Sequence, residues 1–262
     1  MYLFWFMFAF VIGLIFGSFA NVVIYRWPRK LSVVSPPSAC PKCEKRLGVL
    51  DLIPIVSWLA LRGRCRFCRE RISLRYPAVE LACGLLFASM VLYSPTLSAI
   101  PLSALAFVLL CVTMIDWDTQ TIPDGLLIFG AIAGVIWIIC GHFAADLFPF
   151  APDWRDVLLG AMAGALPLFL LDRLTLLFLK KDGFGYGDVK LMAMVGLFLG
   201  WQMTLMALGF AVVFGAAFAI YLLASGKAKR GTYMAFGPFL CAGALAALWL
   251  GEPLLSAYFG LL

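Results

Sequence analysis

Residues 2–25, YLFWFMFAFVIGLIFGSFANVVIY, decide the fold class of this chain. The run carries no charged side chain and exceeds the length of about 20 apolar residues that a helix needs to cross a bilayer. Seven more apolar runs follow it, at residues 77–92, 100–115, 125–141, 157–179, 189–200, 203–224 and 233–250. The pattern predicts an all-α, polytopic membrane helix bundle of about eight transmembrane helices. The run at 189–200 is short enough to be a half-helix or a tilted entry into the next run.

The composition excludes a water-soluble globular protein. Hydrophobic residues make up 64% of the 262 residues and charged residues only 13%, against about 25% charged in an ordinary soluble domain. A chain with so few charges would precipitate in water unless most of its length lay in lipid.

Basic residues gather in loops on one side of the predicted membrane. Twelve of the twenty Lys and Arg residues fall between Arg26 and Arg75. Six more lie in later loops of the same side: Lys180, Lys181, Lys190, Lys227, Lys229 and Arg230. The positive-inside rule identifies that side as the cytoplasm, so both termini are expected to be external. No basic residue precedes the first run, which predicts a permanent first helix and not a cleavable signal peptide.

The net charge of +6 does not indicate a nucleic-acid-binding protein. Membrane topology already accounts for the basic residues, and a basic loop beside a membrane is attracted to anionic lipid. We therefore expect membrane lipid as a partner and no nucleic acid.

The loop at residues 26–76 contains a cysteine pattern typical of a zinc ribbon. Cys40 and Cys43 form one C-x-x-C pair, and Cys65 and Cys68 form a second pair about twenty residues later. Four thiolates fill the coordination sphere of Zn²⁺, so the predicted metal is structural. A cytoplasmic position argues against disulfides, although redox-active or free thiols remain an alternative. The other four cysteines lie in apolar runs, where a thiol usually behaves as a small hydrophobe: Cys83, Cys111, Cys140 and Cys241.

Several catalytic classes are excluded by what the sequence lacks. Its single histidine, His142, falls on the predicted external side, so no H-E-x-x-H metallopeptidase site can form. A Ser–His or Cys–His pair would have to use that one histidine. The sequence has neither a G-x-S-x-G around a serine nor a G-x-x-x-x-G-K-[ST] phosphate loop.

Carboxylates at the edges of apolar runs are the remaining catalytic candidates, because charge is costly in lipid. Asp116 ends the third run, Asp188 begins the sixth within a G-x-G-D motif, and Glu80 lies just inside the second. Asp116 and Asp188 are expected at the same membrane surface, where two facing carboxylates would share a proton. One could then activate water while the other polarises a scissile carbonyl.

Simpler interpretations of the acidic residues remain open. Asp188 could be only the N-cap of its helix, and Asp124 is better explained as an N-cap after Pro123. Asp118 could be a third catalytic carboxylate, but it is better explained as a solvated charge at a helix end.

The chain resembles the type IV prepilin peptidases, which are membrane aspartic peptidases of the G-x-G-D kind. The resemblance extends over the whole chain and rests on an ordered series of motifs. These are residues 17–26 (GSFANVVIYR), 40–43 (CPKC), 53–59 (IPIVSWL), 62–68 (RGRCRFC), 75–80 (RYPAVE), 115–124 (IDWDTQTIPD), 185–190 (GYGDVK) and 236–238 (FGP).

The resemblance implies that Asp116 and Asp188 are a catalytic dyad. It implies an enzyme of the bacterial cytoplasmic (inner) membrane that serves type IV pilus or type II secretion systems. Its substrates would be prepilins and pilin-like pseudopilins, cut between a short basic leader and an apolar N-terminal helix. The active site would lie on the cytoplasmic side.

Family members with the four-cysteine loop also methylate the new N-terminus with S-adenosylmethionine, and the resemblance implies that activity here. The division that the resemblance implies is a first transmembrane helix at 1–25, a cytoplasmic N-methylation loop at 26–76 and a peptidase bundle at 77–262.

Two other functions are compatible with parts of the sequence. A transporter or proton relay could use Asp116 and Asp188, although the chain shows no internal repeat of the transporter kind. A zinc-organised methyltransferase without peptidase activity is a third possibility, but the presence of both aspartates argues against it.

Overall fold

The computed structural model describes residues 2–149, 151–179, 185–226 and 234–260. Several sequence predictions fall outside these ranges: those on Lys180, Lys181, Lys227, Lys229 and Arg230.

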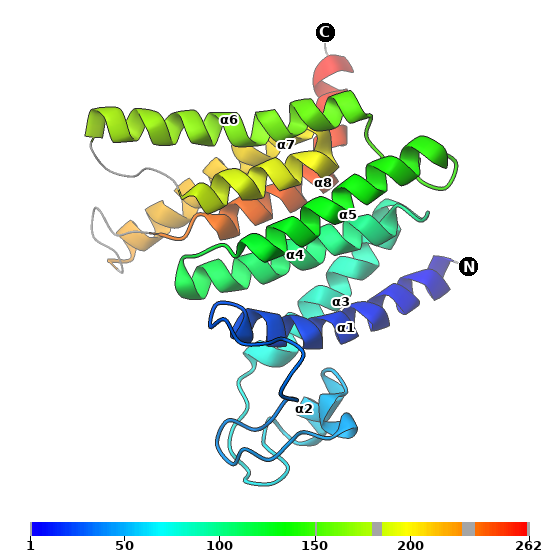
Figure 1. Cartoon of the computed structure of the whole chain (residues 1–262), viewed down its shortest axis with the longest axis vertical. Helices are drawn as coiled ribbons and strands as arrows, with labels where there is room; N and C mark the ends of the chain where they lie inside the picture. Colours follow the sequence, from blue (N-terminus) through cyan, green and yellow to red (C-terminus); the bar gives the residue numbers. More distant parts are fainter. Residues whose placement is uncertain (1, 150, 180–184, 227–233, 261–262) are drawn as a thin grey trace. The chain divides into compact units, whose positions relative to one another are not determined.

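The described residues form helices joined by loops. They contain two isolated β-bridges and no extended β-strand. The long helices are α1 (Tyr2–Arg26), α3 (Arg75–Tyr93), α4 (Ala99–Thr119), α5 (Asp124–Phe143), α6 (Trp154–Leu179), α7 (Tyr186–Ala224) and α8 (Gly237–Gly260). Two short elements, η1 (Val49–Leu52) and α2 (Val56–Ala60), lie in the loop between α1 and α3 (Figure 1). The predicted all-α architecture is confirmed.

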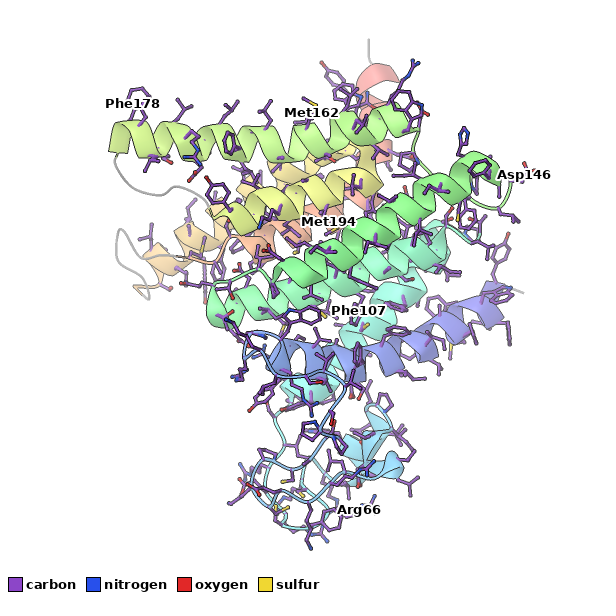
Figure 2. The ribbon with its side chains drawn as sticks, in the orientation of Figure 1. Arg66, Phe107, Asp146, Met162, Phe178 and Met194 are labelled. Atoms are coloured by element: carbon purple, nitrogen blue, oxygen red, sulfur yellow. The ribbon has the colours of Figure 1, made fainter. Side chains whose placement is uncertain are left out.

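The outward faces of the helices are apolar, which is the reverse of a soluble protein. On α6, for example, Met162 and Phe178 are 59% and 75% exposed (Figure 2). Helices satisfy all their own backbone hydrogen bonds, so such a surface is compatible with lipid. Among the described residues, seven helices are long and apolar enough to span a membrane.

The chain divides into two compact units, residues 1–111 and 112–262. In the first unit, α1 packs against α3 through small residues. A Cβ atom on Gly17 would lie 2.6 Å from the Cα atom of Glu80, so only glycine allows the two backbones to come this close. Phe16 of α1 also packs against Phe87 of α3 and Phe107 of α4.

In the second unit, α7 has 39 residues and contains a break at Gly200, whose φ of 68° and ψ of 178° are not helical. This positive φ is costly for any residue with a Cβ atom. The carboxylate of Asp156, in the first turn of α6, accepts a 3.4 Å hydrogen bond from the N–H of Trp201. It therefore satisfies a backbone donor that the break leaves free.

The two halves of α7 run in opposite directions. Near the start of the helix, the charge of Asp188 interacts with that of Asp116 at the end of α4. The next residue of α4, Trp117, makes an edge contact with Phe218 near the end of α7. Both ends of α7 therefore lie at the same end of this unit, and the chain turns back at Gly200.

This reversal explains how seven helices agree with about eight predicted crossings. The runs at 189–200 and 203–224 were expected to be separate helices, and they form the two helical segments of α7 on either side of the non-helical Gly200. Together they pass through the second unit twice. The short run at 189–200 is thus a full pass that continues directly into the next one.

Candidate active site

Asp116 lies in the last turn of α4 and is only 5% exposed. Its Oδ2 atom accepts a 3.0 Å hydrogen bond from the backbone N–H of Gly237. Gly237 is the first residue of α8, where backbone N–H groups are free and the helix dipole favours a negative charge. The start of α8 therefore holds the carboxylate of Asp116.

The sequence around Gly237 explains this contact. A Cβ atom at position 237 would lie 2.6 Å from Oδ2 of Asp116, so the close approach requires glycine. The next residue, Pro238, has no N–H. The N–H groups of Phe239 and Leu240 bond to the carbonyl of Phe236. Gly237 thus supplies the free donor of this first turn.

Asp188 is the third residue of α7 and is half-buried. The helix begins after Gly185, which is its N-cap. A Cβ atom on Gly187 would lie 3.0 Å from Cβ of Ile122, so the glycine lets the start of α7 approach the segment that follows α4. In this way the G-x-G-D motif and the segment after Asp116 come into contact.

The charges of Asp116 and Asp188 interact with each other. Both carboxylates also interact electrostatically with the thiol of Cys241 on α8. Cys241 also hydrogen-bonds the side chain of Thr113. The sequence analysis grouped Cys241 with the other cysteines of the apolar runs as a small hydrophobe. Its position beside the two carboxylates, which distinguishes it from those cysteines, is visible only in the folded structure. The sequence analysis did not identify Gly237 as a partner of Asp116. The Gly237-Pro238 pair was nevertheless a usable signal for the start of a helix, where free backbone N–H groups are found.

The third acidic candidate, Glu80, has a different environment. Its carboxylate accepts a 2.7 Å hydrogen bond from the N–H of Ile55 and a second one from the hydroxyl of Ser18. Glu80 therefore joins the loop segment at residues 53–59 to the packed pair of α1 and α3.

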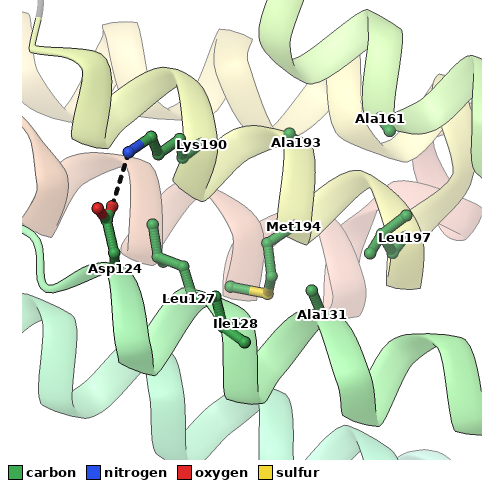
Figure 3. Close-up of a pocket in the computed structure, with 9 residues that line it drawn as sticks. All are labelled: Asp124, Leu127, Ile128, Ala131, Ala161, Lys190, Ala193, Met194 and Leu197. Atoms are coloured by element: carbon green, nitrogen blue, oxygen red, sulfur yellow. Dashed lines mark hydrogen bonds and ion pairs between the residues drawn. The ribbon is translucent and has the colours of Figure 1, made fainter.

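Asp124 is not an N-cap, contrary to the sequence interpretation. α5 begins at Asp124 itself, and Pro123 occupies the N-cap position. The Asp124 carboxylate forms a 2.8 Å ion pair with Lys190, two residues beyond Asp188 (Figure 3). This pair connects the start of α5 to the start of α7. Asp118 is exposed, as the sequence indicated.

A cavity of about 460 Å³ lies beside this ion pair and has a mainly apolar lining (Figure 3). It is lined by Asp124, Leu127, Ile128, Ala131, Ala161, Lys190, Ala193, Met194 and Leu197. Lys190 and Asp188 are two residues apart, so they project from nearly opposite faces of α7. The cavity is therefore on a different side of α7 from the Asp188 carboxylate.

The four cysteines of the loop come together in the first unit. Their sulfur atoms all lie within 4.8 Å of one another, and Sγ of Cys40 is 3.7 Å from Sγ of Cys68. A tetrahedral site with Zn–S bonds of about 2.3 Å would place its sulfurs about 3.8 Å apart. Cys40, Cys43, Cys65 and Cys68 thus form a site that can bind a metal.

The two C-x-x-C pairs have the same local fold. In the first, the N–H of Glu44 bonds to the carbonyl of Cys40, and a β-bridge joins Ala39 to Arg46. In the second, the N–H of Arg69 bonds to the carbonyl of Cys65, and the bridge joins Arg64 to Arg71. An ion pair between Lys42 and Glu70 links the two turns.

Backbone donors favour the thiolate form of Cys40, whereas the pKa of the Cys68 thiol is raised to about 11 by burial and the neighbouring thiols. The N–H groups of Cys43 and Lys42 lower the pKa of the Cys40 thiol to about 6. A metal is bound by thiolates and not by thiols, so the local fold prepares this ligand for binding.

Two family descriptions match this chain. Residues 11–94 match the Bacterial Peptidase A24 N-terminal domain, and residues 103–220 match the Type IV leader peptidase family. The four loop cysteines lie in the first matched segment, and Asp116 and Asp188 lie in the second.

Curated relatives cover almost the full length of the chain. A prepilin leader peptidase/N-methyltransferase from Pseudomonas putida is 37% identical over 93% of this chain and 90% of its own length. A protein of the same name from Stutzerimonas stutzeri is 37% identical over 95% of this chain and 92% of its own length. One from Myxococcus xanthus is 41% identical over 84% of this chain and 64% of its own length. No solved structure matches the chain.

Proposed function

Because the chain belongs to the type IV leader peptidase family, we propose that it is a membrane aspartic endopeptidase whose catalytic residues are Asp116 and Asp188. It cleaves the basic leader from type IV prepilins and pseudopilins and then methylates the new N-terminus with S-adenosylmethionine. The observation that carries the peptidase proposal is that two carboxylates from two helices lie close enough for their charges to interact. One of them is held by a backbone N–H of a third helix.

The geometry supports a shared-proton mechanism. Two interacting carboxylates do not both ionise readily, so one retains a proton. The ionised member takes a proton from water, which attacks the scissile carbonyl, while the protonated member donates to the carbonyl oxygen. The hydrogen bond from Gly237 to Asp116 fixes the direction in which that carboxylate points.

The position of the dyad suits a substrate that is itself a membrane helix. Asp116 lies in the last turn of α4 and Asp188 in the first turn of α7, so both are at helix ends and not in the middle of a span. A peptide bond at the end of a membrane helix has to unwind before water can attack it. This location favours a peptidase over a proton relay. We place the dyad on the cytoplasmic side and both termini outside, on the basic-loop argument.

For the four-cysteine loop we propose structural Zn²⁺ and a role in methyl transfer. Cys40, Cys43, Cys65 and Cys68 would occupy all four positions of the ion, so it would organise the loop and leave no open position for water. We accordingly assign residues 26–76 to methylation and residues 77–262 to cleavage.

The direct test uses purified protein in lipid vesicles with a membrane-inserted prepilin and S-adenosylmethionine. We expect mass spectrometry to show a shorter pilin that has lost its leader and gained one methyl group. When S-adenosylmethionine is omitted, the leader should still be lost and the methyl group should be absent. An intact substrate in every condition would contradict the proposal.

A more specific prediction concerns Gly237. In Gly237→Ala, the added methyl group collides with Asp116, so the carboxylate loses its donor or turns away. A hydrogen bond to a charged group contributes about 1.5–3 kcal/mol, so we expect kcat for cleavage to fall roughly 10- to 100-fold, with KM little changed. Gly209→Ala is the matched control, because its methyl group would meet nothing within 4 Å. Equal effects of both variants would show that Gly237 has only a general structural role.

A further inference from the structure

The loop between α1 and α3 contains an apolar segment that the proposed activities do not explain. It covers residues 49–61, between the two cysteine pairs, and has one charged residue, Asp51. Several of its side chains face away from the protein: Val49 is 84% exposed, Leu50 67%, Val56 59% and Leu59 62%. So many exposed apolar side chains in one short segment indicate an interaction surface.

The single charge of this segment is neutralised within the loop. Oδ1 of Asp51 lies 2.7 Å from Nε of Arg66, and the guanidinium holds the pKa of that carboxyl below its usual range. The exposed face of the segment is therefore left apolar.

Contacts with α1 and α3 place the segment beside the spanning helices. Ile55 donates its N–H to Glu80, which lies five residues beyond the start of α3 at Arg75. This distance is about 7.5 Å along the helix. On α1, the contact partner of Glu80 is Gly17, nine residues before the end of the helix at Arg26. The segment thus reaches back along both helices, past their basic ends.

The length and shape of the segment fit a membrane interface. An apolar stretch of about 10–14 residues is too short to span a bilayer and is typical of interfacial or re-entrant segments. The segment forms η1 and α2, whose internal hydrogen bonds satisfy part of the backbone. The N–H of Ile55, which is outside both, is satisfied by Glu80. Irregular backbone at membrane depth requires such partners.

Charges on either side of the segment identify the partner. Lys45 and Arg46 precede it, Arg62 and Arg64 follow it, and all four are exposed. An apolar face flanked by basic residues complements the surface of a membrane that contains anionic phospholipids. The same basic residues would repel the basic leader of the proposed substrate.

We propose that residues 49–61 form an interfacial membrane element. Val49, Leu50, Val56 and Leu59 insert at the boundary between headgroups and acyl chains, and the flanking basic residues bind anionic headgroups. The element would hold the four-cysteine cluster at the membrane surface, next to the ends of α1 and α3.

The test uses the full-length protein in vesicles of phosphatidylcholine and phosphatidylglycerol. A fluorescent amino acid is introduced by codon suppression at position 50, 56 or 34, one at a time. Val34 is 86% exposed and belongs to the same loop but lies outside the segment, so it is the matched control. We expect brominated acyl chains to quench positions 50 and 56, aqueous iodide not to reach them, and position 34 to show the opposite pattern.

A variant tests whether the apolar face causes the insertion. With the fluorophore at position 59, Leu50→Asp combined with Val56→Asp should remove quenching by brominated lipid, whereas Val34→Asp should leave it unchanged. Retained metal binding by the four cysteines shows that the loop is still folded. Vesicles of phosphatidylcholine alone should weaken the quenching, because the basic residues then have no anionic partner.

Three outcomes would overturn the proposal. One is free access of iodide to positions 50 and 56, and another is equal lipid quenching at position 34. The third is protection that appears only after a prepilin substrate is added, which would identify the segment as a substrate-docking surface. None of these measurements depends on catalysis, so failure here is distinct from failure of the proposed peptidase activity.

Discussion

Replacing Asp116 or Asp188 with asparagine is expected to reduce prepilin cleavage by about 10²- to 10⁴-fold, the range that a positioned acid or base contributes. Asparagine keeps nearly the same shape but can neither take up nor release a proton. Asp116→Asn would still accept the hydrogen bond from Gly237 through its amide oxygen, so the variant should fold. The measurement is the rate of leader loss from a membrane-inserted prepilin.

Further variants test whether Asp116 and Asp188 act together as a dyad or independently of each other. If Asp116 and Asp188 share one proton, the double variant should be no slower than the slower single variant. Asp118→Asn is the matched control, because Asp118 is exposed and lies at the same end of α4. Cleavage near the wild-type rate by either single variant would show that its aspartate is not catalytic. Methylation of a substrate supplied without its leader should persist in all of them.

Removal of the metal is expected to abolish methyl transfer and to leave cleavage largely intact. The turns formed by the two C-x-x-C pairs are held by a few backbone hydrogen bonds and two β-bridges. The four-cysteine cluster has little apolar core of its own. Structural zinc contributes about 10–16 kcal/mol in small zinc-binding peptides, so the turns should unfold without it. Asp116 and Asp188 lie in the other compact unit, and the mechanism proposed for them uses no metal.

This prediction is measured on Cys40→Ser, Cys65→Ser and chelator-treated wild type. Elemental analysis should find about one zinc ion per chain in the wild type and none in the variants. Cys140→Ser is the control for loss of a thiol elsewhere, because Cys140 lies on α5. Full methylation by a protein without metal would show that the cluster has no part in that reaction.

The features predicted from sequence are those that depend on nearby residues. Long apolar runs specify membrane helices because the backbone has to satisfy its own hydrogen bonds in lipid. The cysteine cluster follows from two C-x-x-C pairs, each of which folds as a local turn. The close position of Asp116 and Asp188 was expected because each lies where an apolar run meets a loop.

The features that sequence reasoning missed depend on long-range packing. The end of a run at residue 200 was predicted, but the partner of the break was not: the N–H of Trp201 is satisfied by Asp156, 45 residues earlier in the chain. Asp124 resembled a local N-cap, but its side chain pairs with Lys190, 66 residues away. Both partners are distant in the chain, and for Asp124 the distant partner replaces the local one that the pattern suggested.

The hydrogen bond between Asp116 and Gly237 links residues 121 positions apart, and this separation has a consequence during biosynthesis. A ribosome that adds about 5–20 residues per second needs roughly 6–24 s to make the intervening chain. Throughout that interval α4 is already synthesised, and its terminal carboxylate has no donor from α8. On the proposed mechanism, the catalytic centre is therefore complete only when α8 enters the bilayer, and we expect a chain that has not yet reached α8 to leave the pilins around it unprocessed.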